Sequence, residues 1–138
     1  MPRAIFLPIF AMVALTLVVW LRMYTMRIAQ MKRERIHPQA VATSVQAAAR
    51  LTDSRAADNF RNLFELPVLF YLALLVAAIA GLVTTTTLVL AWLFVVLRIA
   101  HSVIHCGYNK VMHRFQAYLA GSVVLWLLWG YLAFLLYR

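Results

Sequence analysis

The sequence predicts an all-α protein, an integral membrane four-helix bundle of left-handed up-down topology. Hydrophobic residues make up 65% of its 138 residues and charged residues only 12%, whereas soluble globular domains have about half and about a quarter. Thirteen Lys and Arg residues outnumber four Asp and Glu residues, for a net charge of +9. These charges lie mostly in short stretches between long uncharged runs. The pattern excludes a disordered chain, a coiled coil, a soluble enzyme and a DNA-binding domain, so we expect one membrane domain over residues 1–138, in contact with the lipid bilayer and with no nucleic-acid partner.

The first helix is expected at about residues 4–28. A helix needs about 20 apolar residues to cross a hydrocarbon core of about 30 Å, and the uncharged run 4–21 has that size between Arg3 and Arg22. A signal peptide is the competing reading, but its apolar region is usually about 7–15 residues long and precedes a small-residue cleavage site. The basic run 31–35 follows here instead, which favours a retained helix.

Residues 66–97 carry no charge, which is too long for one membrane crossing and suits two. Gly81 and the threonines at 84–87 provide the break between them. We therefore expect the second helix at about 54–82 and the third at about 86–106.

The segment before the second helix has a different character. The residue before Pro38 avoids helical backbone angles, so the preceding helix should end there, while the alanine-rich stretch 41–49 could form a short helix. Residues 52–54 are Thr, Asp and Ser, all good N-cap types, and Asp58 would then lie in the first helical turn, where the helix dipole favours it. The second helix should begin in water, and Pro67 should kink it.

The fourth helix is expected at about 112–137, after a turn at 107–110. Residues 115–137 are uncharged, and aromatic residues typical of a membrane interface enrich their second half: Trp126, Trp129, Tyr131 and Tyr137.

The distribution of Lys and Arg predicts the orientation in the membrane. The third-to-fourth connection carries Lys110 and the threonine-rich connection carries no basic residue, whereas the first-to-second connection carries Arg27, Lys32, Arg33, Arg35, Arg50 and Arg55. In an up-down bundle the two basic connections lie on the same side. Because basic loops favour the cytoplasm, we expect both connections to be cytoplasmic and both termini to lie outside.

Polar residues inside membrane helices mark functional sites because their burial in lipid is unfavourable. All of them in this chain should reach the same depth, near the cytoplasmic side: Arg22, Arg61, Asn62, Glu65, Arg98, His101, His105, Arg114 and Tyr118. This convergence predicts an arginine-rich pocket suited to an anionic ligand.

Simpler structural roles compete with this reading. Arg98 lies about two turns inside its helix, where an unpaired charge costs about 2.5–3.5 kcal/mol, and Glu65 is the acidic residue at that depth, which predicts an Arg98–Glu65 pair. Arg61 and Glu65 could instead form an intrahelical pair. Arg22 and Arg114 could extend to the interface as anchors.

The histidines also suggest a metal. His101 and His105 are four residues apart on one helix, with Cys106 and His113 nearby. No carboxylates complete a ligand shell, and no other predicted helix offers a histidine for a haem. We therefore expect no metal site, and Cys106, as the single cysteine, can form no intrachain disulfide.

The order of these motifs resembles the membrane-associated proteins in eicosanoid and glutathione metabolism, the MAPEG family. The resemblance rests on the segment 58–67, on Arg98 and His101 in the third helix, and on Arg114 and Tyr118 in the fourth. It implies homotrimers of four-helix subunits that bind glutathione between adjacent subunits, near the cytoplasmic side.

The resemblance also implies residue roles. Arg61, Asn62 and Glu65 would hold the polar ends of glutathione. The position of Arg22 at the end of the first helix suggests, apart from the resemblance, that it could hold a carboxylate together with Arg61 and Asn62. Arg98 and His101 match the third-helix motif, Arg114 would face the thiol, and Tyr118 would be a ligand-binding aromatic.

Three positions depart from the family pattern. Asp58 stands where an arginine is usual, His105 where some members have tyrosine, and Phe115 where one branch has serine. A second register, Arg55, Asn59 and Asn62, restores the arginine and loses the glutamate.

The leading interpretation is an integral membrane glutathione-binding protein, a transferase or peroxidase that joins the thiolate of its co-substrate to a hydrophobic small molecule. Arg114 would be catalytic because an adjacent arginine lowers the pKa of a thiol from about 8.5. The alternative is a non-catalytic membrane module that binds a lipid or a partner protein.

Overall fold

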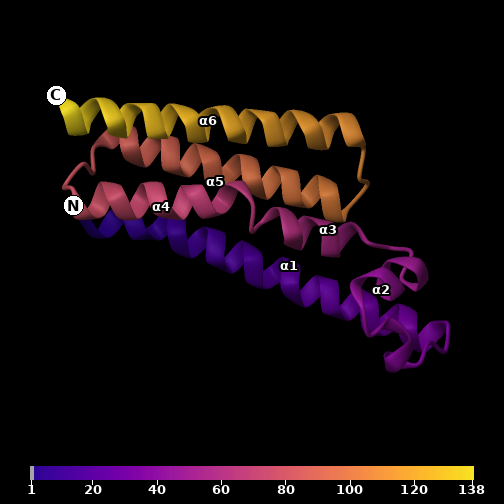
Figure 1. Cartoon of the computed structure of the whole chain (residues 1–138). Helices are drawn as coiled ribbons and strands as arrows, with labels where there is room; N and C mark the ends of the chain where they lie inside the picture. The colour runs from indigo at the N-terminus through magenta and orange to yellow at the C-terminus, as the bar shows by residue number, and fades with distance from the viewer. Residues whose placement is uncertain (1) are drawn as a thin grey trace.

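The computed structural model describes residues 2–138, which contain helices and no strand. Four helical stretches are long and apolar enough to cross a membrane: Arg3–Arg33, Arg55–Ile79, Thr85–Cys106 and Val111–Tyr137. They run side by side as one elongated bundle, with the long connection between the first two at one end (Figure 1). The predicted all-α four-helix membrane bundle is confirmed.

The first span consists of the 3-10 helix Pro2–Ile5 and helix α1, Phe6–Arg33. Helix α1 continues past the expected end near residue 28, because its last turns contain Gln, Met, Lys and Arg, which are strong helix formers. It ends where Arg35 adopts a left-handed φ of 55° and the Ile36 N–H bonds the Met31 carbonyl at 2.9 Å. This is a Schellman turn.

The connection after α1 contains a second 3-10 helix, Pro38–Val41, and helix α2, Ser44–Arg50. His37 is extended, with ψ 137°, as its position before proline predicts. A capping box begins α2, in which Thr43 and Gln46 bond each other's backbone N–H groups. The helix expected in the alanine-rich stretch therefore forms.

The second span is two helices, α3, Arg55–Asn62, and α4, Leu66–Ile79. The kink expected at Pro67 is a complete interruption over residues 63–65. Proline supplies no N–H and its ring clashes with the carbonyl four residues earlier, so a continuous helix is disfavoured. Tighter bonds close the end of α3, from the Phe64 N–H to the Arg61 carbonyl at 3.0 Å and from Glu65 to Asn62 at 3.3 Å.

Helix α3 begins at Ser54 with Asp58 in its first turn, as expected. The Ser54 hydroxyl donates to Asp58 Oδ2 at 2.7 Å, and Arg55 donates to both oxygens of Asp53 at 2.8 Å. These hydrogen bonds from Arg55 lower the pKa of Asp53 below its ordinary value.

This shift predicts a pH dependence of stability. A carboxyl group with a depressed pKa in the folded state contributes stability above its ordinary pKa of about 3.9 and loses it as the pH falls through the folded value. The contribution of Asp53 should stay below about 1 kcal/mol because the pair faces solvent; both side chains are 39% exposed. Unfolding in detergent should lose less stability between pH 7 and pH 2 for Asp53→Asn than for the parent, and an identical loss would contradict the assignment.

Helices α5, Thr85–Cys106, and α6, Val111–Tyr137, form a hairpin. Both begin one residue before their expected starts. Thr84 and Thr87 form a capping box at the start of α5, and the Thr84 hydroxyl lies 3.2 Å from the Tyr131 hydroxyl of α6. This contact joins the two helices at the end of the bundle opposite α2.

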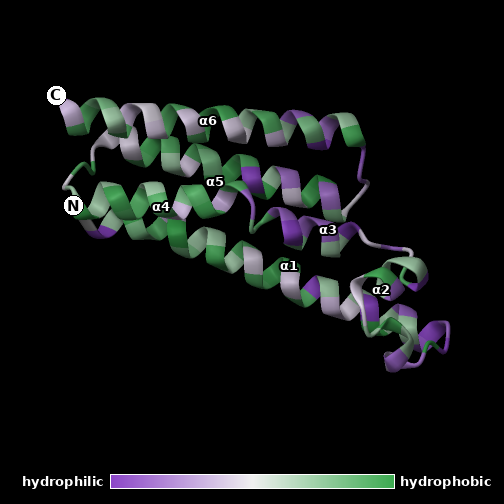
Figure 2. Ribbon diagram, viewed as in Figure 1, coloured by the Kyte–Doolittle hydropathy of each residue, from purple (hydrophilic) through white to green (hydrophobic). Residues whose placement is uncertain are grey.

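The main hydrophobic cluster of the core lies between the four spans. Phe70 of α4 and Phe94 of α5 stack at 4.4 Å between ring centroids, among buried residues that include Met12, Leu74 and Leu125. Many large apolar residues are also exposed on the outer faces, and the ribbon coloured by hydropathy is predominantly hydrophobic along the four spans (Figure 2). A soluble monomer rarely exposes such an extensive apolar surface, whereas a lipid environment accommodates it.

Candidate functional site

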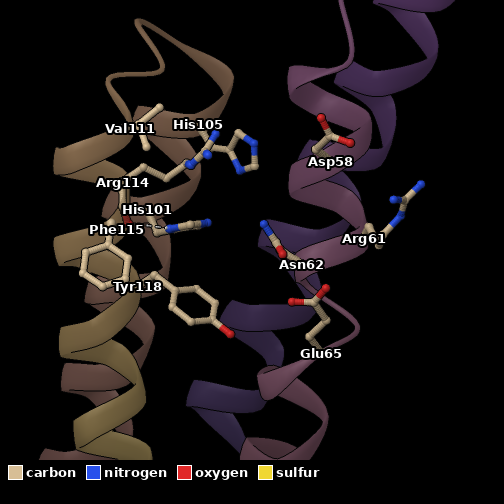
Figure 3. Close-up of a pocket in the computed structure, with 10 residues that line it drawn as sticks. All are labelled: Asp58, Arg61, Asn62, Glu65, His101, His105, Val111, Arg114, Phe115 and Tyr118. Carbon is tan, nitrogen blue, oxygen red and sulfur yellow. Dashed lines mark hydrogen bonds between the residues drawn. The ribbon is translucent and has the colours of Figure 1, made fainter. Parts of the chain in front are cut away.

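A polar cavity of about 510 Å³ lies at the α2 end of the bundle, between α3 with the interruption after it and the α5–α6 hairpin. Figure 3 shows these two walls facing each other. The predicted site residues line it, except Arg22 and Arg98; the full set is Asp58, Arg61, Asn62, Glu65, His101, His105, Val111, Arg114, Phe115 and Tyr118. The structure therefore brings most of the predicted polar residues to one cavity.

The two walls carry opposite charge. Asp58 and Glu65 lie on the α3 side, whereas Arg114 lies on the α6 side, beside the two histidines. Arg61 also borders the cavity, but its guanidinium points away from the opposite wall (Figure 3). A ligand that carries both an ammonium and a carboxylate group suits this arrangement.

Arg114 is held at the edge of the cavity by the turn between α5 and α6. Its Nη1 donates to Asn109 Oδ1 at 2.7 Å, and Asn109 has a left-handed φ of 50°. A guanidinium has five N–H donors. This hydrogen bond uses one of them, so others remain for an anionic ligand.

The two histidines are buried and incompletely bonded. His101 Nδ1 lies 3.2 Å from the Arg114 carbonyl, but His101 Nε2 and His105 Nδ1 have no hydrogen-bond partner. Both rings are directed toward the α3 wall (Figure 3). Because buried polar atoms are usually hydrogen-bonded, these two nitrogens are available to a ligand. Within residues 2–138, no three His, Cys, Asp or Glu side chains are grouped so that they could hold a metal ion.

Arg98 lies beneath the cavity and is only 1% exposed. Its Nη2 donates to the Asn62 carbonyl at 2.9 Å, and its guanidinium lies 5.4 Å from the centre of the Tyr118 ring. Its aliphatic part packs near Gly121 of α6, where a Cβ would lie 3.7 Å from the Arg98 Cδ, an ordinary van der Waals distance. Arg98 therefore connects α5 with the end of α3 and with α6.

The predicted Arg98–Glu65 pair is wrong, and so is the alternative Arg61–Glu65 pair. The ion pairs among residues 2–138 are Arg33–Glu34 and Arg55–Asp53. Glu65 lies in the interruption before α4 and is exposed, so its carboxylate stays hydrated. At the end of α3 the Asn62 carbonyl accepts the Glu65 N–H and also the Arg98 guanidinium, so it takes the place of the expected carboxylate as the partner of Arg98.

Arg22 binds away from the cavity. Its Nη2 donates to the Cys106 carbonyl at 3.3 Å, and Arg55 Nη1 donates to the neighbouring Gly107 carbonyl at 2.6 Å. Both arginines thus lie at the C-terminus of α5, where the helix dipole favours positive charge. Arg22 contributes nothing to the cavity of a single subunit.

The second motif register does not assemble at the cavity. Asn59 is fully buried, where its amide lies 3.4 Å from Cys106 Sγ and accepts a hydrogen bond from the Ser102 hydroxyl at 3.3 Å. Arg55 binds α5, so Asn62 alone of that register borders the cavity. The geometry favours the register of Asp58, Asn62 and Glu65.

Sequence reasoning missed Val111 as a lining residue. Val111, Arg114, Phe115 and Tyr118 are spaced three and four residues apart along α6, which places them on one helix face. The same spacing applied to Arg114 would have found Val111. It supplies an apolar rim beside the charged groups.

Four apolar spans define a multi-pass integral membrane protein, and an open polar cavity lies at one end of its bundle. A model of the MAPEG family matches residues 5–134, nearly the whole chain, and the protein belongs to this family. Membership indicates a membrane protein of glutathione or eicosanoid metabolism. Neither a search of curated proteins nor a search of solved structures finds a match.

Proposed function

We propose that the polar cavity binds glutathione and activates its thiol for reaction with a hydrophobic electrophile. The observation that carries this proposal is the opposition of Asp58 and Glu65 on one wall to Arg114 on the other. The ammonium group of glutathione complements Asp58 and Glu65, and its thiolate complements Arg114. Its two carboxylates can accept hydrogen bonds from Asn62 and the two histidines. The volume of about 510 Å³ lies in the range typical of small-molecule sites.

Arg114 acts on the thiol in this proposal. A thiol has a pKa of about 8.5, and a neighbouring guanidinium stabilises the thiolate and lowers that value. The thiol releases its proton to water, and the sulfur then forms a bond to the electrophilic atom while the leaving group departs with the bonding electrons. No side chain of the protein becomes covalently attached. Asn62, Glu65 and the two histidines hold the polar ends of the tripeptide.

Calorimetric titration of the purified protein with glutathione in mild detergent tests this function. We expect saturable binding that weakens in Glu65→Gln, because the neutral amide loses the charge that holds the ammonium group. Arg138→Gln at the far end of α6 is the control and should bind like the parent. Absence of saturable binding to the parent would reject the proposal and favour a non-catalytic module that binds a lipid or a partner protein.

We also propose that the protein forms homotrimers, with the basic connections in the cytoplasm and both termini outside. The extensive apolar outer faces accommodate neighbouring subunits as well as lipid. A neighbouring subunit would also shield the polar cavity from lipid, which lowers the cost of its charges.

Assembly gives a direct prediction. Native mass spectrometry from mild detergent should detect a species of three 15.8 kDa chains, and cross-linking in membranes should give a matching band. Denaturation before cross-linking is the control and should leave monomers. Detection of monomers alone across several mild detergents would contradict the trimer.

A further inference from the structure

A second charged hollow lies at the end of α1, away from the polar cavity. Its volume is about 350 Å³, and its lining combines apolar side chains with two cations: Ile28, Met31, Ile36 and Pro38 with Lys32 and Arg35. None of these residues borders the cavity between α3 and the α5–α6 hairpin. The hollow is therefore a separate feature of the molecule.

The Schellman turn at the end of α1 forms this hollow. The bond from the Ile36 N–H to the Met31 carbonyl, 2.9 Å long, folds the chain back so that both side chains line the same space. Glycine is the usual residue at the left-handed position of such a turn. Here that position is Arg35, with φ 55°, which adds a guanidinium to the rim where glycine would add none.

The two cations have no carboxylate partner. Within residues 2–138 the ion pairs join Arg33 to Glu34 and Arg55 to Asp53. The carboxylate nearest in sequence, Glu34, accepts hydrogen bonds from Gln30 at 3.1 Å and from Arg33 at 3.5 Å. Lys32 and Arg35 thus keep their positive charge available to an external anion.

The position along α1 places the hollow at the membrane surface. Ile28 lies about 33 Å along the helix from Phe6, at about 1.5 Å per residue, and the hydrocarbon core is about 30 Å thick. Ile28 therefore lies where the hydrocarbon core meets the lipid head groups, and Lys32 and Arg35 lie further along the chain, on the polar side. A ligand at this depth meets a polar phase at one end and an apolar phase at the other.

We propose that this hollow is a binding site for an anionic phospholipid. Lys32 and Arg35 hold the phosphate, since ammonium and guanidinium groups form charge-assisted hydrogen bonds to phosphate oxygens. Ile28, Met31 and Ile36 contact the upper part of an acyl chain. The combination of unpaired cations and apolar lining distinguishes this site from a simple basic surface, and the proposal is independent of glutathione binding.

Native mass spectrometry tests the site, with the protein released from micelles that contain phosphatidylglycerol or phosphatidylcholine with identical acyl chains. We expect adducts that survive with phosphatidylglycerol and are lost with phosphatidylcholine. Removal of one cation should weaken the binding about fivefold, which corresponds to about 1 kcal/mol per basic residue near an anionic bilayer. Soluble glycerol phosphate should not displace the lipid, because it lacks the chain that contacts the apolar lining.

Two variants and a matched control make the test specific. Arg35→Gly removes the guanidinium and suits the left-handed turn, so it should fold at least as well as the parent while it loses lipid. Lys32→Gln should lose lipid to a similar degree. Arg33→Gln, on the same turn but outside the hollow, should retain it. Equal retention of both lipids by the parent, or retention of phosphatidylglycerol by Arg35→Gly and Lys32→Gln, would overturn the proposal.

Discussion

Replacement of Arg114 by alanine should abolish the thiolate absorbance of bound glutathione at neutral pH. The guanidinium is the charged group on the α6 side of the cavity, and without it the thiol should return to a pKa of about 8.5. Each unit of pKa corresponds to about 1.4 kcal/mol of preferential interaction with the anion. Ultraviolet difference spectra over a pH series would measure the change directly.

Lys110 supplies a matched control for this experiment. It is an exposed cation at the N-cap of α6 and does not border the cavity, so Lys110→Gln removes one positive charge from the same end of α6 and leaves Arg114 in place. We expect Lys110→Gln to retain the thiolate signal and Arg114→Ala to retain part of the binding, through Asn62 and Glu65. An unchanged thiolate signal in Arg114→Ala would contradict the catalytic role and favour a non-catalytic protein.

Replacement of Arg98 by alanine should destabilise the protein by about 3 kcal/mol, because truncation of a large buried side chain leaves a void and a hydrogen bond is lost. The void would open between Phe94 and Tyr118, and the Asn62 carbonyl would lose one of its two donors, the other being the Glu65 N–H. Reversible unfolding in mixed micelles, followed by tryptophan fluorescence, would measure the loss.

Two further variants separate the volume of Arg98 from its charge. Arg98→Met fills most of the space without a donor and should fall between the parent and the alanine variant. Arg33→Ala removes an arginine whose side chain is 74% exposed and should leave stability nearly unchanged. Equal stability of Arg98→Ala and the parent would mean that the cost of burying the guanidinium cancels all of its contacts.

Uncharged runs located the membrane helices because lipid imposes a length and a composition on any span. The same rule cannot detect a local interruption, since residues 63–65 are as compatible with a membrane-surface helix as their neighbours. Pro67 pointed to the correct place. Whether such a proline bends a helix or ends it depends on whether nearby groups can form hydrogen bonds with the backbone groups at the interruption. Arg98 does so here, from a different helix.

The predicted helix topology gave the depth of the polar residues along the bundle, but it did not give their hydrogen-bond partners. Glu65 and Arg98 lie at similar depth, yet the arginine bonds a backbone carbonyl that no sequence pattern marks. Arg22 likewise donates a hydrogen bond to a backbone carbonyl, that of Cys106. Every residue has a backbone carbonyl, and the carbonyls at the end of a helix have no partner within the helix. A prediction that pairs each arginine with a carboxylate therefore overlooks these backbone acceptors.

Because of the interruption between α3 and α4, the faces of the two helices are not related by one continuous helical rotation. Asn62 and Glu65 border the polar cavity, while Leu63 and Phe64 border an apolar hollow against α1. In a continuous helix each residue adds about 100° of rotation, so the residues that line the polar cavity and those that pack in the bilayer would be fixed by one common register. With the helix divided, the cavity-lining residues of α3 can diverge among relatives without a change in the packing surface of α4.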